Sequence, residues 1–252
     1  MKNTIAITNQ KGGVGKSTTT QALAEGLRGR GFSVLTVDTD PQGNLSFSMG
    51  ADISDEAVTI YDVLKGKRKA DEAIQHTEQG DVIAANVLLA GAELEFTQTG
   101  REYRLRRALE KVADRYDYIV IDTPPSLGLL TANAYTAADR LIVPMVADIF
   151  SLQGIYQLRD AVEQIREYCN PEIRIDGLLV TKYSSRANVR RDMKDEIAAL
   201  AKEIGCKLYG PIREAAAVLE AQASQQGLQQ YAAGAKVAAD YAAFVDQFLE
   251  ED

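Results

Sequence analysis

Two lysines, two hydroxyl residues and three glycines stand close together near the start of the chain, in the segment Gln10-Lys11-Gly12-Gly13-Val14-Gly15-Lys16-Ser17-Thr18. Glycines let a backbone turn tightly and point its N–H groups inward, and a following helix adds the positive end of its dipole, so the segment is suited to hold phosphate oxygens. Lys16 is placed to reach the β- and γ-phosphates of a nucleotide, and the Ser17 hydroxyl to bind Mg²⁺. The residues expected to contact the nucleotide here are Lys11, Gly12, Gly13, Val14, Gly15, Lys16, Ser17 and Thr18.

The loop departs from the usual phosphate-binding pattern at two positions. That pattern has glycine six positions before its lysine, where this chain has Gln10, and the chain has an additional lysine at position 11. Two ammonium groups five residues apart on one loop cannot easily contact the same phosphate. Lys11 is therefore expected at the loop entrance, pointing outward, and a solvated loop lysine is the plainer alternative.

Carboxylates follow two further apolar runs. Asp38 and Asp40 end the run Val34 to Val37, and Asp122 ends the run Tyr118 to Ile121. The carboxyl ends of parallel strands face one crevice, so these side chains should meet the phosphate loop. Asp122, with Ser17, is expected to bind Mg²⁺. Asp40 is expected to contact the metal or the attacking water, with Asp38 as the competing candidate; taken alone, Asp40-Pro41-Gln42-Gly43 is only a turn signal.

The elements that must position these residues alternate along the chain. Unbroken apolar runs indicate strands buried on both faces at Ile5–Ile7, Val34–Val37, Tyr118–Ile121, Leu141–Val146 and Leu178–Val180. Helical spacing appears at Ser17–Arg30, Leu105–Arg115, Ser151–Tyr168, Val189–Ile204 and Val237–Leu249. This order predicts an α/β fold with a doubly wound, mostly parallel sheet flanked by helices, in a single domain over residues 1–252. Residues 50–100 carry weaker signals and are expected to elaborate the same domain.

The composition of the chain argues against several classes of protein. The 252 residues carry a formal net charge of −8, which excludes a globally basic nucleic-acid binder but permits a local basic patch. Cys169 and Cys206 are isolated, which favours free thiols in a reducing compartment over a metal or cluster site. No apolar run approaches the roughly 20 residues of a membrane span. A cytoplasmic location is expected.

The two-lysine loop resembles the deviant Walker A loop of the ParA/MinD family. The resemblance implies that Lys11 reaches the nucleotide of the opposite subunit in an ATP-bound homodimer and neutralises charge on the transferring phosphoryl group. It also implies that Asp40 lies in switch I and orients the water, that Thr123-Pro124-Pro125 belongs to switch II, and that Pro211 and Arg213 pack against adenine. Lys11, Lys16 and Asp40 are thus the expected catalytic residues, with ATP and Mg²⁺ as ligands.

Within that family the chain resembles the ParA-type partition ATPases of the short type, which lack an N-terminal helix-turn-helix domain. The acidic end Phe248-Leu249-Glu250-Glu251-Asp252 differs from the basic membrane helix of MinD-like relatives, so no membrane binding is expected. The likeness implies a slow ATPase that is stimulated by a ParB-like centromere-binding protein. It also implies non-specific DNA as a ligand of the ATP-bound dimer, and so association with the nucleoid.

A local basic segment bears on the DNA expectation. Residues 182–213 hold eight Lys/Arg and four Asp/Glu, and Arg186, Arg190 and Lys194 are spaced to share one helix face. A solvated helix face remains the alternative. The family's later DNA-contacting arginine has no counterpart, because Ala215-Ala216-Ala217 stand before Glu220. Two other functions therefore stay open: positioning of a non-DNA protein cargo, and a small-molecule kinase or ligase, against which Lys11 argues.

Overall fold

The computed structural model describes residues 3–184 and 188–250, and of residues 93, 149, 150 and 188–192 it describes the backbone alone. The described strands form an eight-stranded sheet in the order β3-β4-β2-β5-β1-β6-β7-β8. All neighbours are parallel except β3, which pairs antiparallel with β4 at one edge. Their bounds are β1 Thr4–Ile7, β2 Val34–Asp38, β3 Ile74–Thr77, β4 Gly80–Ile83, β5 Tyr118–Asp122, β6 Arg140–Val146, β7 Arg174–Thr181 and β8 Lys207–Tyr209. The predicted fold class is confirmed.

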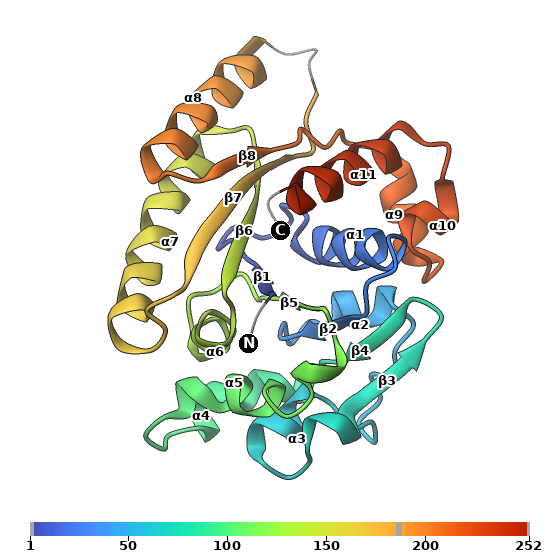
Figure 1. Cartoon of the computed structure of the whole chain (residues 1–252), viewed down its shortest axis with the longest axis vertical. Coiled ribbons are helices and arrows are strands. Elements are labelled where there is room, and N and C mark those ends of the chain that lie inside the picture. Colours follow the sequence, from blue (N-terminus) through green and yellow to red (C-terminus); the bar gives the residue numbers. More distant parts are fainter. Residues whose placement is uncertain (1–2, 185–187, 251–252) are drawn as a thin grey trace.

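Helices cover both faces of this sheet (Figure 1), and each face has its own apolar cluster. On one side lie α3 (Ile60–Lys65), α4 (Ala92–Glu95), α5 (Arg104–Leu109), α6 (Leu129–Ala137), α7 (Ile149–Tyr168) and α8 (Asn188–Ile204). On the other side lie α1 (Lys16–Arg28), α9 (Ala216–Ala223), α10 (Leu228–Ala232) and α11 (Lys236–Leu249), while α2 (Asn44–Ser48) follows β2. Short 3₁₀ helices are η1 Ala70–Ala73, η2 Val87–Gly91, η3 Arg101–Tyr103 and η4 Ala113–Arg115.

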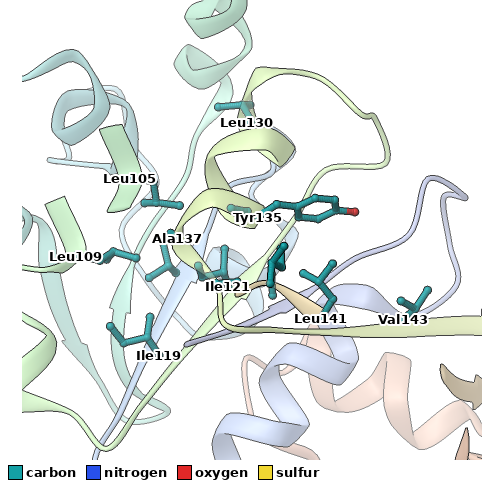
Figure 2. Packing of buried hydrophobic residues seen from close by; sticks show 14 of the residues in the cluster. Leu105, Leu109, Ile119, Ile121, Leu130, Tyr135, Ala137, Leu141 and Val143 are labelled. Atoms are coloured by element: carbon teal, nitrogen blue, oxygen red, sulfur yellow. The ribbon is translucent and has the colours of Figure 1, made fainter. Parts of the chain in front are cut away.

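The central strands are apolar on both faces because both are covered, as the continuous runs in the sequence predict. Figure 2 shows Ile119 and Ile121 of β5 and Leu141 of β6 packed with side chains of α5 and α6. Tyr135 of α6 lies in this cluster with its ring buried, while its hydroxyl, 2.8 Å from Thr8 Oγ1, contacts the loop after β1. The core and the site are therefore in direct contact.

One predicted helix is wrong in extent. Leu105–Arg115 was expected to be continuous, but α5 ends at Leu109 and the chain resumes as η4 at Ala113. Between them Val112 has φ −122° and ψ −7°, outside the helical range, and its side chain is buried in the core. None of the helices within the described ranges has the length and apolar character that a membrane crossing requires.

Candidate nucleotide and metal site

The loop between β1 and α1 has the backbone that its glycines allow. Gly13 and Gly15 have φ of 73° and 91°, in the left-handed region that side chains disfavour, and Gly15 stands at the N-terminus of α1. A Cβ placed on Gly12, Gly13 or Gly15 would meet nothing within 4 Å. The loop thus leaves open space beside the first N–H groups of a 13-residue helix, where an anion is favoured.

Hydrogen bonds from neighbouring strands fix this loop in place. Thr181 Oγ1, at the end of β7, donates to the carbonyl of Val14 at 2.8 Å. Asn9 Nδ2 donates to the carbonyl of Pro144 in β6 at 2.8 Å, and Asn9 Oδ1 accepts from the N–H of Lys11 at 2.9 Å. The loop is therefore held by β6 and β7, which lie on one side of β1 in the sheet.

The sheet register brings two carboxylates together on the other side of β1. β5 lies between β1 and β2, and Asp122 is the register partner of both Ile7 and Asp38. Asp38 and Asp122 are completely buried and Asp40 nearly so. Asp38 accepts hydrogen bonds from the N–H and hydroxyl of Ser46 and from the N–H of Asp40. Burial nevertheless outweighs these bonds and raises the pKa of Asp38 to about 6.

The carboxylate of Asp122 accepts fewer hydrogen bonds than that of Asp38. It accepts hydrogen bonds from Ser17 and, through Oδ1, from Thr20 at 3.3 Å, whereas its buried Oδ2 has no hydrogen-bond partner among the described residues. Burial and, next, the Asp38 carboxylate raise the pKa of Asp122 well above its usual range. The site therefore contains excess buried negative charge, although Lys16 is close enough to offset part of it.

These features fit a magnesium ion bound together with a triphosphate. Mg²⁺ usually takes one or two carboxylates and a hydroxyl, completing its shell with water and phosphate oxygens. Asp122 and Ser17 supply that donor set. No group of three or more His, Cys, Asp or Glu in the described part of the chain is arranged to hold a metal by itself. The ion would thus depend on the nucleotide for the rest of its ligands.

A cavity of about 490 Å³ lies over the loop and is large enough for a nucleotide. Next to the loop it is lined by Gly12, Gly13, Gly15, Lys16, Ser17 and Thr18, and also by Asp40. Its other end is lined by Lys182, Glu214 and the apolar side chains Ala215, Val218, Leu219 and Tyr241. Lys16 is buried, which lowers its pKa, while Asp122 and Asp40 counter that effect.

Lys11 is placed differently from Lys16. Its Nζ lies 2.5 Å from Oδ2 of Asp148, the residue that caps the N-terminus of α7, and both side chains are about one third exposed. Burial alone would raise the pKa of Asp148, but the hydrogen bonds from Lys11 and Ser151 outweigh it and lower that pKa. Both partners of this ion pair belong to the same chain and lie at the entrance of the loop.

The remaining predicted residues are placed as follows. Neither Pro211 nor Arg213 is among the residues that line the cavity, and the Arg213 guanidinium pairs with Asp240 at 2.6 Å. The side chain of Val14 is buried beside the loop. Lys194, on α8, lies 6.0 Å from the ring of Tyr183. Arg186 lies outside the described residues, as does the side chain of Arg190, so the DNA surface stays a prediction.

Sequence reasoning missed Asp148 and Thr181. Asp148 follows β6 as a single acid without a motif, and Thr181 ends a strand that was expected to finish at Val180. Only their position in the sequence could have indicated them, since both residues follow apolar runs. Strands β6 and β7 therefore bring them to the same side of the sheet as Asp38 and Asp122, where the carboxyl ends of the parallel strands lie.

Comparisons with known proteins agree on one family. Residues 2–175 match the family model AAA_31, described as an AAA domain. The sporulation initiation inhibitor protein Soj of Bacillus subtilis (strain 168) is 44% identical over 200 residues, covering 78% of this chain and 79% of Soj. The chromosome partitioning protein ParA of Caulobacter vibrioides (strain NA1000 / CB15N) is 41% identical over 213 residues, covering 82% and 79%.

A solved structure extends the likeness over the whole chain. Cobyrinic acid a,c-diamide synthase from Mycobacterium smegmatis, with bound ADP and magnesium, superposes with a TM-score of 0.86 at 34% identity. The match covers 100% of this chain and 95% of that one. The same fold thus binds ADP and magnesium in that protein.

Proposed function

The chain belongs to the ParA/Soj family of partition ATPases, and from that premise we propose that it is a DNA-segregation switch driven by ATP. ATP binding closes two copies into a sandwich dimer, the dimer holds non-specific DNA, and hydrolysis releases it. A ParB-like protein bound to a centromere-like site stimulates the slow hydrolysis.

The residues that line the cavity support a role for each in this proposal. The N–H groups of the loop and the Lys16 ammonium hold the phosphates, and Asp40 orients the water that attacks the γ-phosphate. Ser17 and Asp122 would hold Mg²⁺, which supplies positive charge against the phosphates and the buried carboxylates. Thr18 and the apolar residues of α9 enclose the rest of the nucleotide.

One observation carries the proposal: Lys11 lies at the loop entrance, on Asp148, rather than inside the cavity. Lys16 lines the cavity and, in this proposal, holds the phosphates of the nucleotide bound by its own chain. Lys11 is a second cation, at the rim of the cavity, and both side chains of its ion pair with Asp148 are about one third exposed. Its ammonium can therefore leave Asp148 and contact the triphosphate bound to another copy. Placed there, it offsets charge that develops on the transferring phosphoryl group.

The experiment is a measurement of molecular size by light scattering with ATP and Mg²⁺, for the wild type and for Lys11→Ala. We expect a dimer for the wild type and a monomer for the variant. A dimer formed equally by both would reject the role of Lys11. DNA retention with ATP, with ADP and for Lys16→Ala then tests the switch, and equal retention in all three would reject it.

The DNA surface itself is proposed from Arg186, Arg190 and Lys194, which fall on or just before α8. The start of α9 carries Ala216 and Ala217 where a second arginine would strengthen that surface, and this favours the alternative of a non-DNA protein cargo. DNA binding by the Asp40→Ala variant, which should hold ATP without hydrolysing it, decides between the two. Binding that disappears in Arg186→Glu excludes the alternative.

The likeness to cobyrinic acid a,c-diamide synthase favours a third candidate, ATP-dependent ligation on a small molecule. Such an enzyme consumes ATP only with its acceptor present. ATP hydrolysis by the purified chain without any acceptor, further increased by DNA and a partner protein, would exclude it.

A further inference from the structure

A group of apolar side chains is exposed on the edge of the molecule formed by residues 51–64 and 84–96. Ile53, Val87, Leu88 and Leu94 are 37%, 68%, 42% and 85% exposed. Their neighbours Leu89, Ala92 and Phe96 are buried, so η2 and α4 pack on the core while Val87, Leu88 and Leu94 point to solvent. Exposed apolar residues that gather in one region mark a binding surface more often than scattered single ones do.

Contacts to α3 hold these residues along one strip. At the N-terminal end of α3, Ile60 N–H donates to the carbonyl of Ala84, and Asn86 Nδ2 donates to the carbonyl of Ser54. Along α3, Tyr61 in its first turn and Lys65 at its end both bond to the carboxylate of Glu95. The six residues of α3 span about 9 Å at 1.5 Å per residue, so a helix of a few turns is long enough to cover the strip. Figure 1 shows α3 and α4 beside each other at one end of the molecule.

The acidic charge of the strip lies around Ile53. Asp52, Asp55 and Glu56 are exposed beside Ile53, and residues 51–64 and 84–96 contain no lysine or arginine. At the other end, Lys65 pairs with Glu95, Lys67 lies near that carboxylate, and Arg104 lies over the ring of Phe96. Basic and apolar groups together are therefore the complement of the end formed by residues 51–57.

This charge decides among the possible occupants. Nucleic acid and anionic lipid would be repelled by the acids. A second copy of the chain would place the same acids against each other in a two-fold contact, which like charges disfavour. A basic amphipathic segment of another protein can pack apolar side chains on the leucines and place its cations against the carboxylates.

We propose that the acidic strip, formed by residues 51–57, 86–88 and 94–95, is a docking surface for a basic amphipathic segment of a partner protein. The occupant lays apolar side chains on Val87, Leu88 and Leu94 and its Lys or Arg against Asp52, Asp55 and Glu56. The surface lies outside the nucleotide cavity, so peptide binding can be tested without nucleotide.

The test uses a dye-labelled helical peptide of Leu and Lys, about 14 residues long, and its counterpart with Glu for Lys, which we titrate with the full chain and follow by fluorescence anisotropy. We expect the Lys peptide alone to bind. The Val87→Lys/Leu94→Lys double variant should weaken that binding about tenfold, because each lysine removes an apolar contact and places a positive charge against the lysines of the peptide. Asp52→Asn/Asp55→Asn/Glu56→Gln should weaken it severalfold.

Two matched controls keep the result specific. Tyr156→Lys/Tyr168→Lys changes two exposed aromatics of α7, and Asp160→Asn/Glu167→Gln/Glu172→Gln removes three exposed acids elsewhere. Both should bind the Lys peptide as the wild type does, and hydrogen exchange should show protection at residues 51–57 and 86–96. Equal weakening by a control, equal binding of the Glu peptide, protection elsewhere or no binding overturns the proposal. So does self-association of the wild type that the Val87→Lys/Leu94→Lys variant abolishes.

Discussion

The ammonium of Lys11 and the carboxylate of Asp148 form an ion pair within one chain, at 2.5 Å, across 137 residues of sequence. Asp148 also accepts from the N–H and hydroxyl of Ser151, so the same carboxylate that begins α7 holds Lys11. If Lys11 contacts the nucleotide of a second copy, it must first leave Asp148. The pair then opposes dimer formation by whatever free energy it contributes.

Asp148→Asn should therefore favour the ATP-dependent dimer. Asparagine keeps an oxygen for Ser151 but loses the charge that holds Lys11. A partly exposed ion pair contributes about 1 kcal/mol or less, and a dimer breaks two, so the dissociation constant should fall by up to about thirtyfold. Analytical ultracentrifugation with ATP and Mg²⁺ measures it. Asp246→Asn, which breaks the exposed pair with Arg30, is the control and should leave the constant unchanged. A weaker dimer in Asp148→Asn would show that the acid supports the contact instead.

Asp122→Asn should stabilise the nucleotide-free protein while it abolishes hydrolysis. Its Oδ2 is buried without a hydrogen-bond partner in the described structure, and burial raises the pKa of Asp122. The native state thus binds this proton more tightly than the unfolded chain, so the wild type loses stability as pH rises above the usual aspartate range. The free energy of unfolding of the variant should exceed that of the wild type by about 1 kcal/mol or more at pH 7.5.

Urea denaturation at several pH values tests the predicted direction in which the free energy of unfolding changes with pH. The gap between Asp122→Asn and wild type should shrink toward pH 4, where the unfolded carboxyl also binds a proton. A gap that is constant with pH would mean that packing, not charge, separates the two proteins. With ATP and Mg²⁺ the order should reverse, because the variant loses a metal ligand.

Thr181→Val should weaken nucleotide binding without unfolding the chain. Its hydroxyl donates to the Val14 carbonyl at 2.8 Å and so holds the phosphate loop against β7. Loss of that bond leaves a buried carbonyl short of a donor, which costs about 1 kcal/mol and should raise the dissociation constant for ATP about fivefold. Calorimetric titration measures the change. Thr181→Ser keeps the hydroxyl and should restore most of the affinity; an equal loss in both variants would show that the hydroxyl bond to Val14 is not what sets the affinity.

The same substitution should have opposite effects on stability at two glycines. Gly15→Ala places a side chain at φ 91° and should lower the free energy of unfolding by about 1–2 kcal/mol. Gly154→Ala lies within α7, where a Cβ meets nothing within 4 Å, and should raise it by about 0.5–1 kcal/mol. Urea denaturation of both variants measures these two changes in the free energy of unfolding. A Gly15→Ala variant as stable as the wild type would mean that the loop readily takes another conformation.

The parts of the fold set by local pattern were predictable. Apolar runs located the central strands, and the parallel register that such runs imply places Asp38 opposite Asp122. Helix α6 was not predicted, because Leu129–Ala137 is buried on nearly every side and so lacks an amphipathic period. The Lys11–Asp148 pair was not predictable either. It depends on β6 lying next to β1, a strand order that no local pattern of residues encodes.

The backbone that ends β4 connects the acidic strip to the catalytic crevice. Ala85 N–H donates to Ser46 Oγ, which donates to Asp38, and a Cβ on Gly43 would lie 3.0 Å from the Ala85 carbonyl. The next residue, Asn86, donates a hydrogen bond from its side-chain amide to the carbonyl of Ser54. A displacement of Asn86 by a bound peptide would thus reach Asp38 through the covalent link to Ala85 and then through two hydrogen bonds, from Ala85 to Ser46 and from Ser46 to Asp38. By thermodynamic reciprocity, nucleotide and peptide would then alter each other's affinity by one and the same factor.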